Sequence, residues 1–278
     1  MTPPGPPYGP GSVLWRVNKE AAILLSGGRA LLLQLAHPGI AAGVDEHSDF
    51  RRHPVRRLWR TLDRMLRLAF AEPQDLRRAA RQINQAHQGV QGPGYRAADP
   101  RLLLWVQATL IDSGLQAYER FFQPLTPAER EAYYRDWKRM GALLGLPEAA
   151  QPETYDDFAA YWSSMLEGDE LCVDERARDL ASAVLRPPLR LLPNLAWKPL
   201  VIITAGLLPE HLRDAYGLPW RRREQRAYRV LEAAVRASRH LPAPLREMPI
   251  ARGAAARRRH GSGQLPPSAA RLPSGPDI

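Results

Sequence analysis

Residues 99–122, DPRLLLWVQATLIDSGLQAYERFF, form a long and uninterrupted helical pattern. Asp99 suits the N-cap of a helix because its carboxylate accepts a free backbone N–H, and Pro100 suits the first turn because that position needs no N–H donor. The pattern runs to about Phe122, and Pro124 breaks it. These residues predict a long helix and favour a helical protein.

The segments on both sides of this helix are also helical in pattern. Residues Thr126–Glu129 form a capping box with proline in the first turn, so a further helix should begin there and end near Gly145. Helices are also expected over residues 13–26, 29–36, 154–166, 173–185 and 219–240. Residues 89–98 are rich in Gly and Pro and are expected to form a loop. No segment alternates as a strand does, so the predicted fold class is all-α, with a single multi-helix domain.

The composition indicates one folded domain with unstructured ends. The chain has 278 residues, 45% of them hydrophobic, which is enough for a sizeable core. The Pro/Gly-rich start predicts a disordered tail over residues 1–11, and the Pro- and Arg-rich end predicts another over residues 241–278. The helical domain is therefore expected over residues 12–240.

Several common site types are excluded by missing motifs. The first residues, MTPPGPPYGPGS, lack the basic and apolar regions of a signal peptide, so a cytoplasmic protein is expected. The single cysteine, Cys172, excludes an internal disulfide, iron–sulfur ligation and covalent haem attachment. The sequence holds no phosphate-binding loop, nucleophile elbow, HExxH zinc motif or ExxH di-iron motif.

The net charge of +10 is concentrated at one end of the chain. Residues 219–278 hold thirteen arginines and four acids, a net charge of +9, whereas residues 1–218 carry only +1. Such a segment is either a solvated surface or a docking surface for nucleic acid or an anionic membrane. The apolar run Leu200–Leu208 is likewise either a packed helix or a segment at a membrane interface. We expect no nucleic acid partner, and peripheral contact with the inner face of the membrane through residues 197–240 stays an alternative.

Residues 53–90, HPVRRLWRTLDRMLRLAFAEPQDLRRAARQINQAHQGV, carry the side chains that best suit a functional site. The stretch predicts two helices joined by a proline-bearing turn. Arg57, Arg60 and Thr61 share one face of the first helix because they are three and four residues apart. His87 lies near the end of the second helix among small and apolar residues. An isolated histidine there is either a packed core residue or the one axial ligand that a b-type haem needs.

Several longer motifs resemble one known family. They are GGRALLLQLAHPGIAAGVDEHSDF (27–50), RLWRTL (57–62), INQAHQGV (83–90), WVQATLIDSGLQAYERFF (105–122) and LTPAEREAYY (125–134). Over about residues 12–235 the chain resembles the mpaB-type oxygenases and the catalytic domain of rubber oxygenase (latex clearing protein). The resemblance implies an all-helical, globin-like core with haem b, and a reaction of dioxygen with a small apolar substrate that is prenyl- or polyketide-like.

The resemblance also implies roles for single residues. His87 matches the proximal ligand of the haem iron, and Arg57 and Thr61 match the catalytic arginine and threonine of the family. Arg57 would contact a haem propionate or a developing oxyanion, and Thr61 would bond iron-bound oxygen or hold Arg57 in place. The alternative for these two residues is an ordinary surface cation and a hydroxyl bonded to its own helix.

Further positions near the implied cofactor are matched by Arg60, His37 and His47. The two histidines would either line the haem pocket or pack at helix ends. Rubber-cleaving members have a lysine that caps the iron where this chain has Arg60, and arginine cannot do so because it stays protonated. Many relatives carry a histidine where this chain has Gln107.

The catalytic base of rubber-cleaving members has no secure counterpart here, and Asp45 and Glu46 are the nearest candidates. Three functions remain open on these grounds. The first is a haem-dependent oxygenase, the second is a haem-binding protein without turnover, and the third is a non-haem helical protein that docks through its basic C-terminal helix. The oligomeric state has no signature in the sequence.

Overall fold

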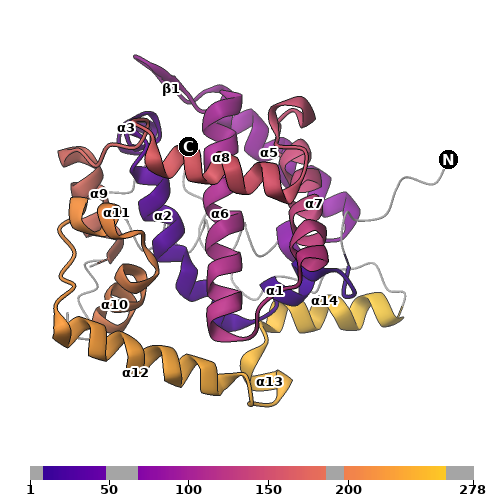
Figure 1. Ribbon diagram of the computed structural model, residues 1–278. Coiled ribbons are helices and arrows are strands. Elements are labelled where there is room, and N and C mark those ends of the chain that lie inside the picture. Colours follow the sequence, from indigo (N-terminus) through magenta and orange to yellow (C-terminus); the bar gives the residue numbers. More distant parts are fainter. Residues whose placement is uncertain (1–8, 48–67, 186–196, 261–278) are drawn as a thin grey trace, which may run out of the picture.

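The computed structural model describes residues 9–47, 68–185 and 197–260, which form an assembly of helices with one short hairpin (Figure 1). The predicted all-α class is confirmed. The helix α6 (Pro100–Phe121) runs through the middle of the assembly. The other helices of the described residues are α1 (Val13–Asn18), the 3₁₀ helix η1 (Ala21–Ser26), α2 (Gly27–Leu35), α3 (Pro38–His47), α5 (Pro73–Gln88), α7 (Pro127–Leu143), the 3₁₀ helix η2 (Glu148–Ala150), α8 (Tyr155–Glu167), α9 (Glu175–Leu185), α10 (Lys198–Leu207), α11 (Glu210–Ala215), α12 (Arg222–Ser238), α13 (Ala243–Arg246) and α14 (Pro249–His260).

The helix α6 is central because it is buried along its whole length. Its N-cap is Asp99, whose side chain accepts the N–H of Arg101 at 2.8 Å. Trp105, Ile111 and Phe121, which span the helix, are each at most 1% exposed. It packs against α2, η1 and α7, and burying each large side chain contributes about 1.5–3 kcal/mol. The helix predicted for residues 99–122 is therefore confirmed.

The apolar run Leu200–Leu208 forms most of α10, which is a packed helix. It buries Ile203 and Leu207, and it lies between α2 and α12. A Cβ at Gly28 would overlap the Thr204 hydroxyl, so glycine at that position lets α2 and α10 approach closely. Within the described residues, no helix combines the length and the apolar character needed to cross a bilayer.

A buried ion pair joins α2 to α6. Arg29 on α2, 3% exposed, contacts Asp112 on α6 at 2.6 Å from Nη2 to Oδ2. Its Nη1 donates to Ser113 Oγ at 2.8 Å, and its Nε donates to the Leu207 carbonyl at 2.7 Å. Burial raises the pKa of Asp112 and the Arg29 guanidinium opposes that rise. One guanidinium therefore connects α2, α6 and the end of α10.

Replacing Arg29 by methionine should lower the free energy of unfolding by roughly 3–5 kcal/mol, because Asp112 is left buried without its cation. The double variant Arg29→Met/Asp112→Leu should lose less than Arg29→Met alone, since neither charge then remains. Urea unfolding followed by circular dichroism measures both losses. Arg16→Met is the control: its pair with Glu129 is solvent-accessible, so the loss should be at most about 1 kcal/mol. Additive losses in the double variant would contradict this account.

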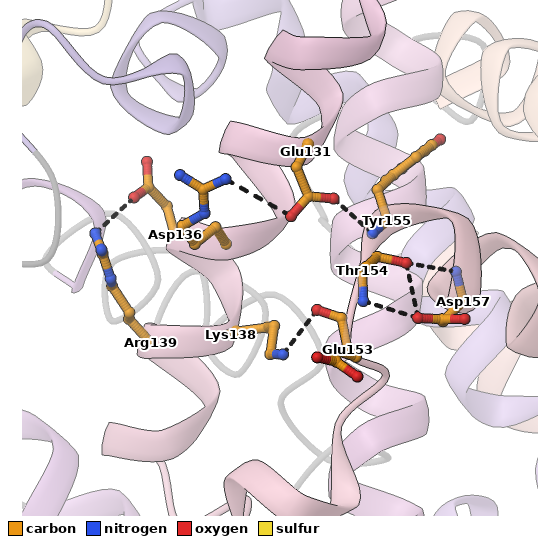
Figure 2. Close-up of polar contacts among 9 residues, drawn as sticks. Glu131, Asp136, Lys138, Arg139, Glu153, Thr154, Tyr155 and Asp157 are labelled. Carbon is orange, nitrogen blue, oxygen red and sulfur yellow. Dashed lines mark hydrogen bonds and ion pairs between the residues drawn. The ribbon is translucent and has the colours of Figure 1, made fainter.

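Capping boxes start both α7 and α8. The Thr126 hydroxyl accepts the N–H of Glu129 on α7, whose carboxylate accepts the N–H of Thr126 in return. This confirms the helix start predicted from the sequence. Thr154 and Asp157 repeat the arrangement at α8, as Figure 2 shows. The pKa of Glu129 is lowered to about 2. The hydrogen bond from the Thr126 backbone N–H has the largest effect, and the hydrogen bond from Arg16 has the next largest.

The carboxylate of Asp136 on α7 is in an environment that disfavours its charged form, in contrast to that of Glu129. Its residue is 7% exposed, and burial raises its pKa to about 6, against the opposing effect of Arg139 and the Leu14 backbone. The ion pair with Arg139, which Figure 2 draws, is long at 3.4 Å. The native state therefore holds a proton on Asp136 more tightly than the unfolded chain does.

Because the folded pKa lies above the unfolded one, stability should fall as pH rises from about 4 to about 6. Asp136→Asn removes that dependence and should stabilise the protein by roughly 1–2 kcal/mol at pH 7, with the gain vanishing near pH 4. Urea unfolding over this pH range measures the effect. The control is Asp157→Asn. The hydrogen bonds from Thr154 lower the pKa of Asp157, so the loss of its charge should lower stability, and the loss should be larger at pH 7 than at pH 3. A gain for Asp136→Asn that does not change with pH would contradict the assignment.

Residues 243–246 and 249–260 are helical, so the disordered tail predicted from residue 241 begins too early. The helices α13 and α14 return to the N-terminal end of the chain. Met248, Ala251 and Ala254, at most 4% exposed, pack in one cluster with Trp15 and Phe70. The abundance of Arg, Pro and Ala concealed this face, because two of its three buried side chains are alanines. Residues 261–278 lie outside the described residues.

The returning segment also divides the helix predicted over residues 13–26. The helix α1 ends at Asn18, and the chain resumes as the 3₁₀ helix η1 at Ala21. Between them the Lys19 carbonyl accepts the N–H of Met248 at 2.7 Å, and Glu20 forms an antiparallel bridge with Glu247. Because the C-terminal segment takes these backbone groups, the α-helical hydrogen-bond ladder stops there.

Candidate functional site

Part of the predicted site lies outside the described residues. Arg57, Arg60 and Thr61 belong to residues 48–67, so their proposed tasks stay predictions. The structure describes the three candidate histidines, His37, His47 and His87.

His87 lies in the last turn of α5, on the face that the helix buries. Leu76 and Ala80 on this face are at most 2% exposed, Ile83 is packed against the core, and His87 follows four residues later, half-buried. Asn84 fixes the position of the helix by donating to the Leu143 carbonyl at 3.1 Å. The carbonyls at the end of a helix carry partial negative charge, which favours a cation beside this imidazole.

This environment fits one axial iron ligand. A b-type haem needs an imidazole on an apolar helix face, and the α5 face supplies it. Among the residues that the structure describes, no group of three or more His, Cys, Asp or Glu side chains could hold a metal ion by itself.

His37 is the residue before α3, and its ring caps that helix. Its Nδ1 accepts the N–H of Gly39 at 3.2 Å, which requires that nitrogen to be unprotonated. Burial lowers the pKa of His37, with Glu170 opposing, which favours the neutral ring. A neutral ring that accepts at Nδ1 carries its proton on Nε2. In this tautomer His37 has no lone pair left for iron, but it can donate one hydrogen bond.

Replacing His37 by alanine should cost about 1 kcal/mol of stability, the usual value of a lost N-cap, and His37→Asn should recover most of it. The pKa of the folded state is lowered, so the unfolded chain takes up the proton first and the wild type should lose stability as pH falls below about 6.5. Both variants should lack that contribution. Unfolding between pH 5 and 8 tests this, and equal pH profiles for wild type and His37→Asn would count against it.

His47 contacts the hairpin that lies between α5 and α6. Its strands β1 (Gln91–Gly92) and β2 (Tyr95–Arg96) pair antiparallel within the predicted 89–98 loop. His47 Nε2 lies 3.1 Å from the Gln91 carbonyl. A helix of ten residues is about 15 Å long, so His37 and His47, at opposite ends of α3, cannot both contact one iron.

The acids next to His47 are held in polar contacts. Glu46 accepts a hydrogen bond of 2.6 Å from the buried Tyr95 hydroxyl, and burial together with this bond raises the pKa of Tyr95 to about 12. Arg176 on α9 lies 3.6 Å from both Asp45 and Glu46. These contacts anchor the hairpin and α9 to α3. A role of either acid as catalytic base stays a prediction.

Gln107 has a task in packing. Its Nε2 donates to Gln151 Oε1 at 3.0 Å and to the Trp137 carbonyl at 3.2 Å. Gly141 on α7 leaves the room that the amide occupies, because a Cβ there would overlap Gln107 Oε1. Gln151 donates in turn to the Lys138 carbonyl at 3.2 Å. Gln107 is thus part of a buried amide network that joins α6, α7 and the residue after η2.

Sequence reasoning missed this network and the Arg29–Asp112 pair. Both members of the pair have a signal in the sequence: Arg29 is the lone cation of the apolar run RALLLQLA, and Asp112 is the lone acid within WVQATLIDSGL. An isolated charge in a buried helix predicts a partner of opposite charge. The identity of that partner is decided by how the helices pack.

The chain matches the family described as "ER-bound oxygenase mpaB/B'/Rubber oxygenase, catalytic domain" over residues 15–237. It belongs to that family, as the sequence motifs had indicated. Among curated proteins it is similar to an uncharacterized protein of Mycobacterium bovis and one of Mycobacterium tuberculosis. Each is 32% identical over 226 residues, which cover 76% of this chain and 87% of the relative. No solved structure gives a significant match, so the globin-like arrangement of the core stays a prediction.

Proposed function

We propose that the protein is a haem b-dependent oxygenase that uses dioxygen on an apolar, prenyl- or polyketide-like substrate. Membership of the oxygenase family over residues 15–237 supports the reaction class. The observation that supports the cofactor is the position of His87, half-buried on the apolar face of α5 beside the negative end of the helix. Substrate class is inferred from the family, because likeness of fold alone does not define a substrate.

When bound, haem would supply an iron that can activate dioxygen. His87 would hold that iron through a neutral ring nitrogen. Arg57 would donate hydrogen bonds to a propionate or to a developing negative charge, and Thr61 would orient Arg57 or hydrogen-bond the oxygen. Arg60 stays protonated and cannot ligate iron, so a resting form capped by this side chain does not arise.

The absorption spectrum of protein produced with added haem tests the proposal. Wild type should show an intense Soret band, and His87→Ala should lose or shift it because the axial ligand is gone. His211→Ala is the matched control, since His211 is exposed on α11. Colourless wild-type protein, or equal loss in the control, would refute haem binding through His87.

Turnover is tested separately on the same preparation. Ferrous protein should consume dioxygen when a prenyl compound is added, and mass spectrometry should find oxygen in the product. A stable oxy complex with no consumption would instead identify a haem-binding protein without oxygenase activity. Arg57→Ala and Thr61→Ala should keep the Soret band and lower turnover, with Arg78→Ala on the exposed side of α5 as control.

A further inference from the structure

One face of α12 is exposed and strongly basic. Arg222, Arg226, Arg229 and Arg236 lie on it at spacings of four, three and seven residues, and Val230 lies beside them. Figure 1 places α12 along an edge of the molecule. Residues 221–246 hold eight arginines and two glutamates, a net charge of +6.

Most of this charge is not neutralised by neighbouring acids. The two glutamates of α12 are already engaged: Glu224 accepts the N–H of Arg221 at 3.0 Å, and Glu232 lies near Arg120 and Arg236 at 4.0 and 3.9 Å. Arg222, Arg226 and Arg229 form no ion pair with any described residue. The face is therefore a cationic stripe open to an anionic partner.

Apolar side chains gather at the same edge of the molecule. In the described part of the chain, the large hydrophobic side chains that are exposed are Leu24 at 38%, Val230 at 69%, Leu241 at 44% and Leu245 at 71%. All four belong to η1, α12, α13 or the residues between α12 and α13. A groove of about 360 Å³, lined mainly by Leu25, Phe122, Leu231, Val235 and Leu245, is a separate feature. Leu231 and Val235 lie nine and thirteen residues after Arg222, so they face away from the stripe.

We propose that this edge, formed by the cationic stripe of α12 and the exposed aliphatic side chains of Val230, Leu241 and Leu245, docks on an anionic lipid bilayer. Arginines next to exposed aliphatic side chains suit a bilayer interface, where phosphates meet the guanidinium groups and acyl chains meet the leucines. A nucleic acid would satisfy the arginines but would set Val230 and Leu245 against phosphates. A second copy of the chain would bring two faces of equal charge together. The proposal is independent of haem binding.

Binding to vesicles is the test. Wild-type protein should co-sediment with vesicles of phosphatidylglycerol and phosphatidylcholine at low salt, but not with phosphatidylcholine alone, and raised salt should release it. Arg226→Glu/Arg229→Glu should weaken binding at least tenfold, because each arginine near an anionic surface contributes a factor of roughly five. The matched control is Arg96→Glu/Arg101→Glu, which makes the same change of charge. These two residues lie at the N-terminal end of α6, a helix of 22 residues that is about 33 Å long.

The apolar part is tested at constant charge. Val230→Ser/Leu245→Ser should weaken vesicle binding several-fold and leave the salt dependence unchanged, with circular dichroism confirming the fold. The proposal fails if wild type binds neutral and anionic vesicles equally, or if the control pair loses as much as the α12 pair. The proposal also fails if the protein binds duplex DNA more tightly than it binds the vesicles and if Val230→Ser/Leu245→Ser changes neither affinity. A dimer in sedimentation equilibrium that Leu245→Ser dissociates would assign this edge to a second copy.

Discussion

The buried contact between Arg29 and Asp112 is the constraint on which the arrangement of helices depends. A guanidinium that is 3% exposed must satisfy its donors inside the protein, and it does so with Asp112, Ser113 and the Leu207 carbonyl. The three acceptors come from α6 and from the end of α10. The ion pair and its two hydrogen bonds therefore join α2 to α6 and to the end of α10.

The candidate site is built at the side of this core, where α3, α5 and the hairpin meet. Here the polar side chains have separate tasks. His37 caps α3, Tyr95 and Arg176 hold the acids of α3, and His87 remains on the buried face of α5 as the iron ligand that we propose. A haem site needs one imidazole in apolar surroundings.

The proposed docking edge on α12 lies apart from the candidate site and depends on different interactions. The site depends on burial, whereas the stripe of α12 depends on charges that stay in water and on Val230 and Leu245, which no described element covers. An apolar substrate held in a bilayer would be concentrated near an enzyme docked in this way. The family match ends at residue 237, just before α13 adds Leu245 to the edge.

The sequence by itself determined much of the local structure. The caps of Asp99 and Thr126, the stop at Gly145 and the helical periods are properties of near neighbours along the chain, and the helices α6 and α7 formed as predicted. Motifs at several positions were also sufficient to indicate the family. What only the tertiary structure decided are contacts between distant residues. These include the Arg29–Asp112 pair, the packing of Gln107 against Gly141, and the return of α14 over α1, which ended the first helix early. Such contacts depend on how helices cross, and a residue's type and local spacing do not contain that information.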